Sequence, residues 1–453
     1  MYYLNEDILF RIEFFGGVLI NKRNFTRYEL NKSQAIFVKA VELVGDLEQA
    51  KNIHDFFLEE KEYDIDRFLS LGIIQNKDSS NYREKLSSID AINEIKSITD
   101  EIFKLNFLSA PLEITIYPTL NCNLNCKFCF LKNKKSNEIS SKKWLEIIKQ
   151  AKDMGVLSIS ILGGEPSIYS EIDDLLLGIE QIGINTTITT NGSKLKESTK
   201  RILSESKFIV PVISLQSLNE KNMYLMGKDY KETLSTIEYF LKNKKNIRVN
   251  SVYTNQSVEE ILEVLDYVVD NNIERYSIAS YVNSNDKNFG LKKRTLKDSR
   301  NLEEKIDKYI QEKYTNKEIN WSIEGCLLYS AYPEIMNEIN ELSEFNKLYY
   351  GCRAAKSKIE IYANGDVYPC ICFEDLIDIT SNILSSNLKS IWTNDLNLNK
   401  LRNDKATSRD CLECGFNNFC NGGCPALKRK VYSDQYNKLK DPNCCIDNIK
   451  DRK

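Results

Sequence analysis

The central part of the chain alternates between β-rich segments and amphipathic helices. Strands are expected at 112–120, 156–162, 184–190, 208–215, 247–254 and 275–282. Helical segments lie between them, and in one of these Ile172, Leu175, Leu176 and Ile179 recur at the spacing of a single helix face. Strands that are separated by helices pair in parallel through right-handed crossovers. The sequence therefore predicts an α/β fold with a parallel sheet, either doubly wound or curved into a barrel.

Length and composition restrict the class of protein. A chain of 453 residues is too long for one compact core, so two or three domains are expected. The formal net charge of −3 provides no basic field for nucleic acid, and no apolar run is long enough to cross a bilayer. The opening segment MYYLNEDILF lacks the basic and apolar regions of a signal peptide. We therefore expect a cytoplasmic protein that binds neither nucleic acid nor a membrane.

The chain contains 13 cysteines and a single histidine, His54. Disulfides are rare in the reducing cytoplasm, so the cysteines are expected to bind metal or to react. Zinc sites commonly combine Cys with His, but here thiolates must supply nearly every ligand. All-thiolate sites are structural zinc sites or iron–sulfur clusters. His54 itself is expected on a helix surface, without a role as a ligand.

Three of the cysteines, Cys122, Cys126 and Cys129, lie directly after the first expected strand. A cubane cluster takes four ligands, so three thiolates can hold it and leave one iron open. Structural zinc would need a fourth ligand nearby, and no further cysteine follows in this part of the chain. The turns GGEP (163–166) and TNG (190–192) follow the next two strands. Loops that follow strand C-termini gather at one rim of a barrel, so these three loops predict the mouth of an active site.

The cysteine loop resembles the Cys-x3-Cys-x-aromatic-Cys signature of the radical S-adenosylmethionine (SAM) enzymes, with Phe128 at the aromatic position. The resemblance implies a partial (β/α)6 barrel of the TIM type, with a 4Fe–4S cluster on the three cysteines. It also implies that SAM binds the open iron and yields a 5′-deoxyadenosyl radical on reduction. The cofactor-binding residues that it implies are Phe128, Gly163, Gly164, Glu165, Pro166, Asn191, Ser214 and Gln216.

Two positions depart from the pattern of this family. Gln216 stands where relatives carry an Asp after the fourth strand. An Arg that is common in relatives is replaced near Met226, and Lys228 is the candidate substitute. The pattern therefore does not identify the partner of the SAM carboxylate.

The C-terminal cysteines follow a longer pattern. Its order is Cys352-x12-Gly365-x4-Cys370, then Cys411-x2-Cys414-x5-Cys420-x3-Cys424, then Cys444. Eight thiols could serve two structural zinc sites, but the order and spacing resemble the SPASM extension of radical SAM enzymes. That resemblance implies two auxiliary 4Fe–4S clusters. Their ligands would be Cys352, Cys370 and Cys424 for the first, and Cys411, Cys414, Cys420 and Cys444 for the second.

The first auxiliary cluster would lack one ligand. Cys326, Cys372 or a group of the substrate could fill that position, and Cys445 is expected to be spare. The segment 359–370 alternates like a β-hairpin that turns at Asn364-Gly365. Such a hairpin would present its last residue, a cysteine, to the cluster.

Residues 1–75 differ in character from the rest. The segment FRIEFFGGVLIN predicts a hairpin that turns at Gly16-Gly17, and helices are expected after it, two of them near 47–58 and 64–73. Such a winged-helix-like αβ domain could bind DNA, but 9 Lys and Arg against 13 Asp and Glu give it a charge of −4. It resembles the PqqD-like peptide-recognition domain of peptide maturases. The resemblance implies that the leader of a precursor peptide adds a strand to the hairpin edge.

Together the resemblances divide the chain into five parts. They are a PqqD-like leader-recognition domain at 1–78, a linker helix at 79–110, a radical SAM partial barrel at 111–300, a bridging region at 301–345 and an iron–sulfur SPASM domain at 346–453.

The activity that the resemblances imply is the installation of an intramolecular crosslink in a ribosomally synthesised precursor peptide. The crosslink would be a thioether or a carbon–carbon bond, and a flavodoxin or ferredoxin would donate the electron. A formylglycine-forming, sulfatase-type maturase and a peptide epimerase are the alternatives within this chemistry, and Gln216 in place of Asp disfavours the former. A zinc-bearing regulator with a winged helix is the alternative of another class, and the acidic first domain disfavours it.

Overall fold

The structure is a computed structural model, and its described residues form two compact units, 1–111 and 112–453. The described residues are 1–22, 26–59, 63–76, 85–131, 137–227, 230–281, 290–292, 294–315, 317–348 and 350–446. Within them, no helix is long and apolar enough to cross a membrane.

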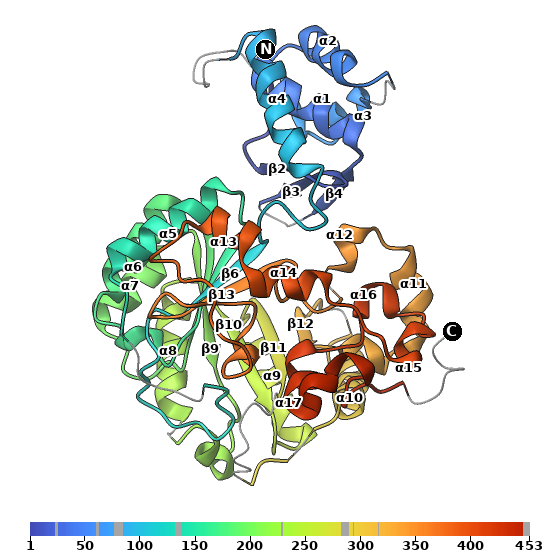
Figure 1. Cartoon of the computed structure of the whole chain (residues 1–453). Coiled ribbons are helices and arrows are strands. Elements are labelled where there is room, and N and C mark those ends of the chain that lie inside the picture. The colour runs from blue at the N-terminus through green and yellow to red at the C-terminus, as the bar shows by residue number, and fades with distance from the viewer. Residues whose placement is uncertain are drawn as a thin grey trace. The chain divides into compact units, whose positions relative to one another are not determined.

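The first unit combines a small antiparallel sheet with four helices (Figure 1). The sheet has the order β2-β3-β4, and β1 pairs separately with β5. The strands are β1 Tyr2–Leu4, β2 Ile8–Glu13, β3 Gly16–Asn21, β4 Arg27–Leu30 and β5 Ile74–Asn76. The helices are α1 Lys32–Val44, α2 Leu47–Phe57, α3 Ile65–Ser70 and α4 Ser88–Ile102. Local signals set α1, because Asn31 and Gln34 form a capping box and Gly45 ends the helix in a left-handed conformation.

The hairpin of this unit turns two residues earlier than the sequence predicts. Glu13 pairs with Gly16, so the turn is at Phe14-Phe15, and Gly16 and Gly17 begin β3. Packing explains the glycines, because a Cβ on Gly16 would lie 2.1 Å from the carbonyl oxygen of Leu30. Gly16 therefore marks a close approach of the end of β4, and Gly17 lies against Arg11 of β2 and Ala35 of α1, so the pair does not mark the turn.

His54 is fully buried, so the expectation of a helix-surface histidine is wrong. Its Nε2 lies 2.8 Å from the Ser33 hydroxyl, and its Nδ1 lies 3.1 Å from a carboxylate oxygen of Asp55. The residue belongs to the face of α2 that packs on α1, together with Ala50 and Ile53.

Helix α4 packs within the first unit, where Ala91 and Ile95 are part of the hydrophobic core. Beyond this helix, a buried ion pair holds the chain. Arg11 binds Glu13 and donates to the carbonyls of Ala110 (3.1 Å) and Pro111 (3.2 Å), while Glu13 accepts from the Ser109 amide at 2.6 Å. The first unit therefore extends through the segment that was expected to be a linker helix.

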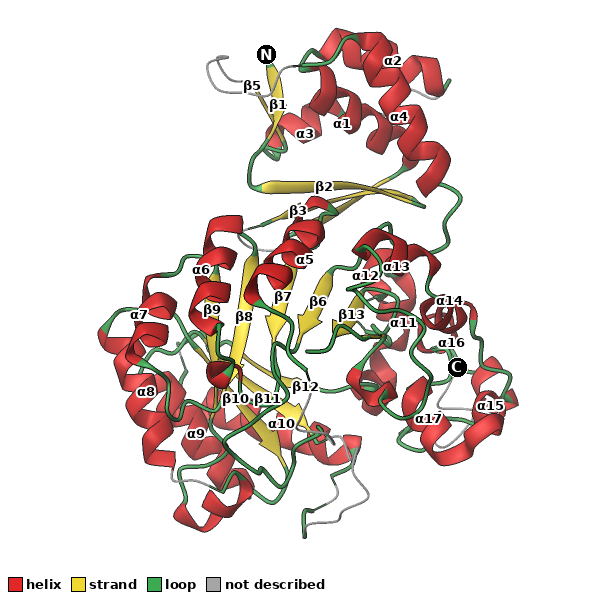
Figure 2. Ribbon diagram, turned by 60° about the vertical axis from the view of Figure 1, so that its left-hand side comes forward, coloured by secondary structure: helices red, strands yellow, loops and turns green. Residues whose placement is uncertain are grey.

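The second unit is built on a nine-stranded sheet with the order β12-β11-β10-β9-β8-β7-β6-β13-β14 (Figure 2). The six predicted strands are present and pair in parallel in sequence order. They are β6 Glu113–Ile116, β7 Ser158–Ile161, β8 Asn185–Thr190, β9 Ile209–Ser214, β10 Arg248–Tyr253 and β11 Arg275–Ser280. The crossover helices are α5 Ser141–Asp153, α6 Ile172–Ile182, α7 Glu197–Glu205, α8 Tyr230–Lys242 and α9 Val258–Asp270. The expectation of a parallel α/β fold is confirmed.

Three further strands extend the sheet beyond the predicted six. β12 (Trp321–Glu324) follows helix α10 (Leu296–Lys313) and pairs with β11 in parallel. At the other edge, β13 (Lys358–Ile361) pairs in parallel with β6, and β14 (Val367–Tyr368) returns antiparallel to β13. The β13–β14 hairpin turns at Asn364-Gly365, as the sequence predicts, with Gly365 at a φ of +89°.

The remaining C-terminal elements are short. The α-helices are α11 Met336–Glu341, α12 Glu344–Lys347, α13 Leu388–Asn394, α14 Leu396–Asn403, α15 Arg409–Leu412, α16 Asn417–Cys420 and α17 Pro425–Tyr432. The 3-10 helices of the second unit are η1 Pro166–Ile168, η2 Glu220–Leu225, η3 Leu328–Ala331, η4 Pro333–Ile335, η5 Ile371–Phe373 and η6 Ser433–Lys438. A small apolar cluster that includes Tyr329, Phe416 and Phe419 packs against four cysteines, so thiols form part of this core.

Candidate iron–sulfur and cofactor sites

The loop with Cys122, Cys126 and Cys129 follows β6 at the C-terminal end of the strand. All three cysteines are half-buried. The end of η2 fixes the loop, because the amide of Lys127 donates to the carbonyl of Leu225 at 2.9 Å and the Cys126 thiol lies 3.9 Å from the carbonyl of Met226. These contacts therefore fix the backbone of the short loop that carries the three thiols.

The glycine turn after β7 lies directly against the start of this loop. The amide of Gly164 donates to the carbonyl of Thr119 at 3.0 Å, and the amide of Glu165 donates to the carbonyl of Asn121 at 2.8 Å. A Cβ on Gly163 would lie 2.4 Å from the Thr119 oxygen, and a Cβ on Gly164 would lie 1.9 Å from the Asn121 oxygen. Only glycine fits at these two positions, because it has no side chain.

Glu165 joins the turn after β7 to the loop after β8. Its carboxylate is buried and accepts from the Thr190 hydroxyl at 2.7 Å, from the Asn191 amide at 2.8 Å and from the Ser167 amide at 3.1 Å. The side chain of Asn191 in turn donates to Asn123 of the cysteine loop at 2.9 Å. These hydrogen bonds join the three loops that were predicted to form one mouth. The Glu165 carboxylate therefore holds the loops at the rim in place.

Gln216 carries a buried donor that has no acceptor. Its Oε1 accepts from the Val252 amide of β10 at 2.6 Å, and the side chain is 4% exposed. Its Nε2 has no hydrogen-bond partner among the described residues. A buried donor without an acceptor costs about 1–3 kcal/mol, so this amide is suited to a bound group that supplies an acceptor.

The other implied SAM contacts are placed as follows. Phe128 is half-buried in the turn between Cys126 and Cys129, and Pro166 begins η1. Ser214 is half-buried at the end of β9. Lys228, the candidate substitute for the Arg of relatives, lies outside the described residues.

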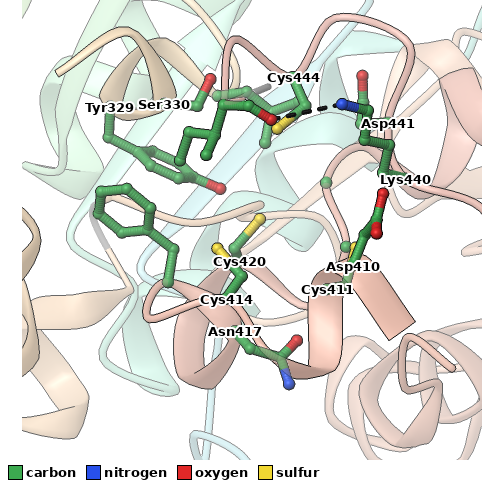
Figure 3. Close-up of a pocket in the computed structure, with 15 residues that line it drawn as sticks. Tyr329, Ser330, Asp410, Cys411, Cys414, Asn417, Cys420, Lys440, Asp441 and Cys444 are labelled. Atoms are coloured by element: carbon green, nitrogen blue, oxygen red, sulfur yellow. Dashed lines mark hydrogen bonds between the residues drawn. The ribbon is translucent and has the colours of Figure 1, made fainter. Parts of the chain in front are cut away.

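Four cysteines in the C-terminal region line one cavity of about 440 Å³ (Figure 3). They are Cys411, Cys414, Cys420 and Cys444. Burial raises the pKa of Cys420 to about 12, and the neighbouring thiols act in the same direction. The buried Tyr329 hydroxyl interacts with the Cys420 thiol, and this interaction acts against the effect of burial on the pKa of that thiol. The structure thus brings together the four thiols that were assigned to the second auxiliary cluster.

A second group of thiols contains Cys352, Cys370 and Cys424. Burial raises the pKa of Cys424 far above its usual range, and Cys352 and Cys326 are the next causes. The surrounding protein atoms raise the pKa of Cys326 to about 12 by desolvation, and the nearby Cys352 and Cys370 thiols raise it further. Part of the Cys326 residue is nevertheless exposed to solvent. The Cys372 thiol neighbours Cys370, which raises its pKa. Both thiols considered for the fourth ligand therefore lie beside this group.

The four cysteines that line one cavity are the number of ligands that a cubane cluster takes. Among the described residues, no three His, Cys, Asp or Glu side chains are gathered closely enough to hold one metal ion.

Asp441 is a site residue that the sequence reasoning missed. Its buried carboxylate accepts from the amides of Cys424 and Asn443, both at 2.7 Å, and its carbonyl accepts from the Cys444 amide at 3.0 Å. It therefore positions one cysteine of each thiol group. A single Asp in a polar segment gives no pattern that would identify it.

Comparison with known proteins agrees with this geometry. The radical SAM superfamily matches residues 116–268, and an iron–sulfur cluster-binding domain, SPASM, matches residues 352–415. The structures of Streptococcus suis SuiB bound to S-adenosylmethionine and bound to its precursor peptide SuiA are 39% identical to this chain, with TM-scores of 0.87 and 0.89. Each alignment covers 98% of this chain and 100% of SuiB. The PqqA peptide cyclase of Rhizobium meliloti is 21% identical over 351 residues, which are 76% of this chain and 89% of the cyclase.

The identity to SuiB extends along nearly the whole chain. The two matched segments contain the three cysteines of the rim loop and the SPASM cysteines up to Cys414, whereas Cys420, Cys424 and Cys444 follow the SPASM match. The zinc-bearing regulator is therefore excluded. The chain belongs to the radical SAM superfamily and carries a SPASM iron–sulfur domain in its C-terminal part.

Proposed function

We propose that this chain is a radical SAM peptide maturase that installs an intramolecular crosslink, a thioether or a carbon–carbon bond, in a ribosomally synthesised precursor peptide. The observation that carries the proposal is the end-to-end similarity to SuiB, which has been solved in complex with a precursor peptide. The PqqA peptide cyclase supports the same class of substrate. SuiB and the PqqA peptide cyclase give no support to the formylglycine-forming or the epimerising alternative.

Cys122, Cys126 and Cys129 would hold the 4Fe–4S cluster that, with SAM, supplies the 5′-deoxyadenosyl radical. The glycine turn and Glu165 keep the cysteine loop and the β8 loop together, which fixes the floor of the SAM site. Gln216 offers its unpartnered amide to a polar group of SAM.

The SPASM thiols would hold two auxiliary 4Fe–4S clusters. Cys352, Cys370 and Cys424 would bind the first, with Cys326 or Cys372 at its fourth iron. The second would be bound by Cys411, Cys414, Cys420 and Cys444, which line one cavity. A flavodoxin or ferredoxin would act as the electron donor.

The first unit would act as a PqqD-like domain and receive the leader of the precursor. In the order β2-β3-β4, strands β2 and β4 are the edges to which a leader could add through backbone hydrogen bonds. Hydrogen exchange with and without the precursor tests this binding mode. Protection of β2 or β4 amides would support strand addition, whereas protection confined to the rim of the second unit would show that the barrel binds the leader.

Co-expression with the cognate precursor peptide tests the activity itself. A crosslink removes two hydrogens, so mass spectrometry should find the core peptide about 2 Da lighter, with fragmentation blocked between the joined residues. An unchanged mass with inverted stereochemistry would identify an epimerase instead. Conversion of a Cys of the core peptide to formylglycine would identify a sulfatase-type maturase.

A further inference from the structure

Lys428 is a buried lysine between the two thiol groups of the SPASM domain. It lies on α17, which begins directly after Cys424, and it is 2% exposed. A cavity of about 400 Å³ is lined by Lys428 together with Cys352 of the first thiol group and Cys420 of the second. Lysine is almost never fully buried unless its charge has a partner.

Gly422 shows where the ammonium group lies. A Cβ built on this glycine would lie 2.8 Å from Lys428 Nζ and 3.7 Å from Cys411 Sγ. The ammonium and the thiol are therefore close neighbours beside Gly422. Its φ of +79° and the lack of space both require glycine at this position.

No carboxylate in the described part of the chain pairs with Lys428. Every ion pair found within 4.0 Å among those residues involves other side chains, and no hydrogen bond donated by the Lys428 ammonium is found among them. Asp441 is the nearby acid on which Lys428 acts, but its two carboxylate oxygens accept from the Cys424 and Asn443 amides. A buried ammonium is costly unless negative charge lies near it, and its place between the two thiol groups suits it to a further negative group besides Asp441.

An auxiliary iron–sulfur cluster would be that negative group. A cubane with four thiolate ligands carries a net charge of −2 when oxidised and −3 when reduced, and net charge is one of the factors that set its potential. A cation beside it favours the reduced form, because the attraction grows with the added electron.

We propose that Lys428 is the counter-charge of the SPASM clusters and raises the reduction potential of the second one, which is held next to it by Cys411 and Cys420. The inference rests on the proposed auxiliary clusters. Lys428 is a positioning residue in this role, since it acts on the potential and contacts neither the substrate nor SAM.

The test uses the full chain, reconstituted anaerobically, in a background in which Cys122, Cys126 and Cys129 are replaced by Ala so that only auxiliary signals remain. Redox titration followed by electron paramagnetic resonance compares Lys428→Met, which removes the charge, with Lys428→Arg, which keeps it. Lys430→Met is the matched control, because Lys430 is exposed on the same helix. We expect one auxiliary potential to become more negative in Lys428→Met and to stay near the parent value in the other two variants.

Iron and sulfide analysis keeps the outcomes distinct. About eight irons per chain in the background protein correspond to two cubane clusters. Full iron content with an unchanged potential in Lys428→Met would overturn the role of Lys428 alone. Four irons or fewer in the background protein would overturn the auxiliary assignment, and the inference with it. Loss of iron in both Lys428 variants would show a role in packing instead of charge.

Discussion

The two kinds of thiol site in this chain are held by different means. The cysteine loop after β6 is positioned by its neighbours, since backbone amides of the turn after β7 and a carbonyl of η2 fix it and a buried Glu165 closes the network. The SPASM thiols are held by short helices, and four of the cysteines pack into a small apolar cluster. The rim loop is therefore held by backbone contacts with neighbouring loops, whereas the SPASM thiols lie among short helices, and we expect a bound cluster to stabilise that region.

The largest effect should separate the two kinds of site by function. Replacement of Cys126 by Ala removes one of the three thiols that we propose as cluster ligands on the rim loop, so we expect cleavage of SAM to methionine and deoxyadenosine to fall to background. The fold should be unchanged, because the loop is fixed mainly through backbone bonds. Circular dichroism and product analysis after dithionite reduction check this. Unfolding of the barrel in Cys126→Ala would contradict the view that backbone contacts, and not the thiols, hold the rim loop.

Replacement of Cys414 by Ala should destabilise the surrounding structure, unlike the replacement of Cys126. We expect loss of the second auxiliary cluster and hydrogen exchange at least about tenfold faster within 411–446, which corresponds to about 1.4 kcal/mol. Exchange in the barrel strands should stay unchanged. Mass-spectrometric hydrogen exchange measures both regions in one experiment. Equal destabilisation of both regions would mean that the SPASM sites and the barrel fold as one cooperative block.

Replacement of Gly164 by Ala should damage the rim through sterics alone. The new Cβ would meet the Asn121 oxygen at 1.9 Å, so the turn must move, and we expect a loss of about 2 kcal/mol or more in stability with weaker SAM binding. Gly290→Ala is the control, because Gly290 has a positive φ but no atom within 4 Å of the added Cβ. Its cost should be about 1 kcal/mol. Thermal unfolding and equilibrium SAM binding measure the two effects.

The smallest effect concerns Gln216. Replacement by Leu removes the amide that would bind SAM, and we expect the affinity for SAM to fall about three- to tenfold, the value of one hydrogen bond. Isothermal titration of the reconstituted protein measures this. Unchanged affinity would mean that SAM does not accept a hydrogen bond from Gln216, and that another group, such as the peptide, is the acceptor.

The sequence predicted the regular parts of the second unit well. Each of the six strands has enough residues of high β propensity to be recognised, and amphipathic helices separate the strands. The crossover rule then sets the order of the strands. The rim contacts followed from that order, as Gly164 and Asn191 show. Strand β12 was not predicted because none of its four residues is buried, so it lacks the buried apolar positions of the other strands.

Other features could not be read from local patterns. Gly16-Gly17 has the composition of a hairpin turn, but close contact with the end of β4 explains Gly16, and contact with β2 and α1 explains Gly17. His54 is buried because helix α2 packs that face on α1, and one polar residue in an amphipathic helix does not reveal its partner. Lys428 and Asp441 are likewise single charged residues, and only the three-dimensional arrangement places them beside the thiols.

The pairing of β13 with β6 has a consequence for how this protein can be divided. The hairpin after residue 357 completes the sheet of the barrel at its β6 edge. A truncation that removes the SPASM region would leave β6 as an unpaired edge strand, open to association with other chains. A chimaera that exchanges SPASM regions between relatives should therefore carry β6 and the hairpin from the same parent, so that their register is inherited together.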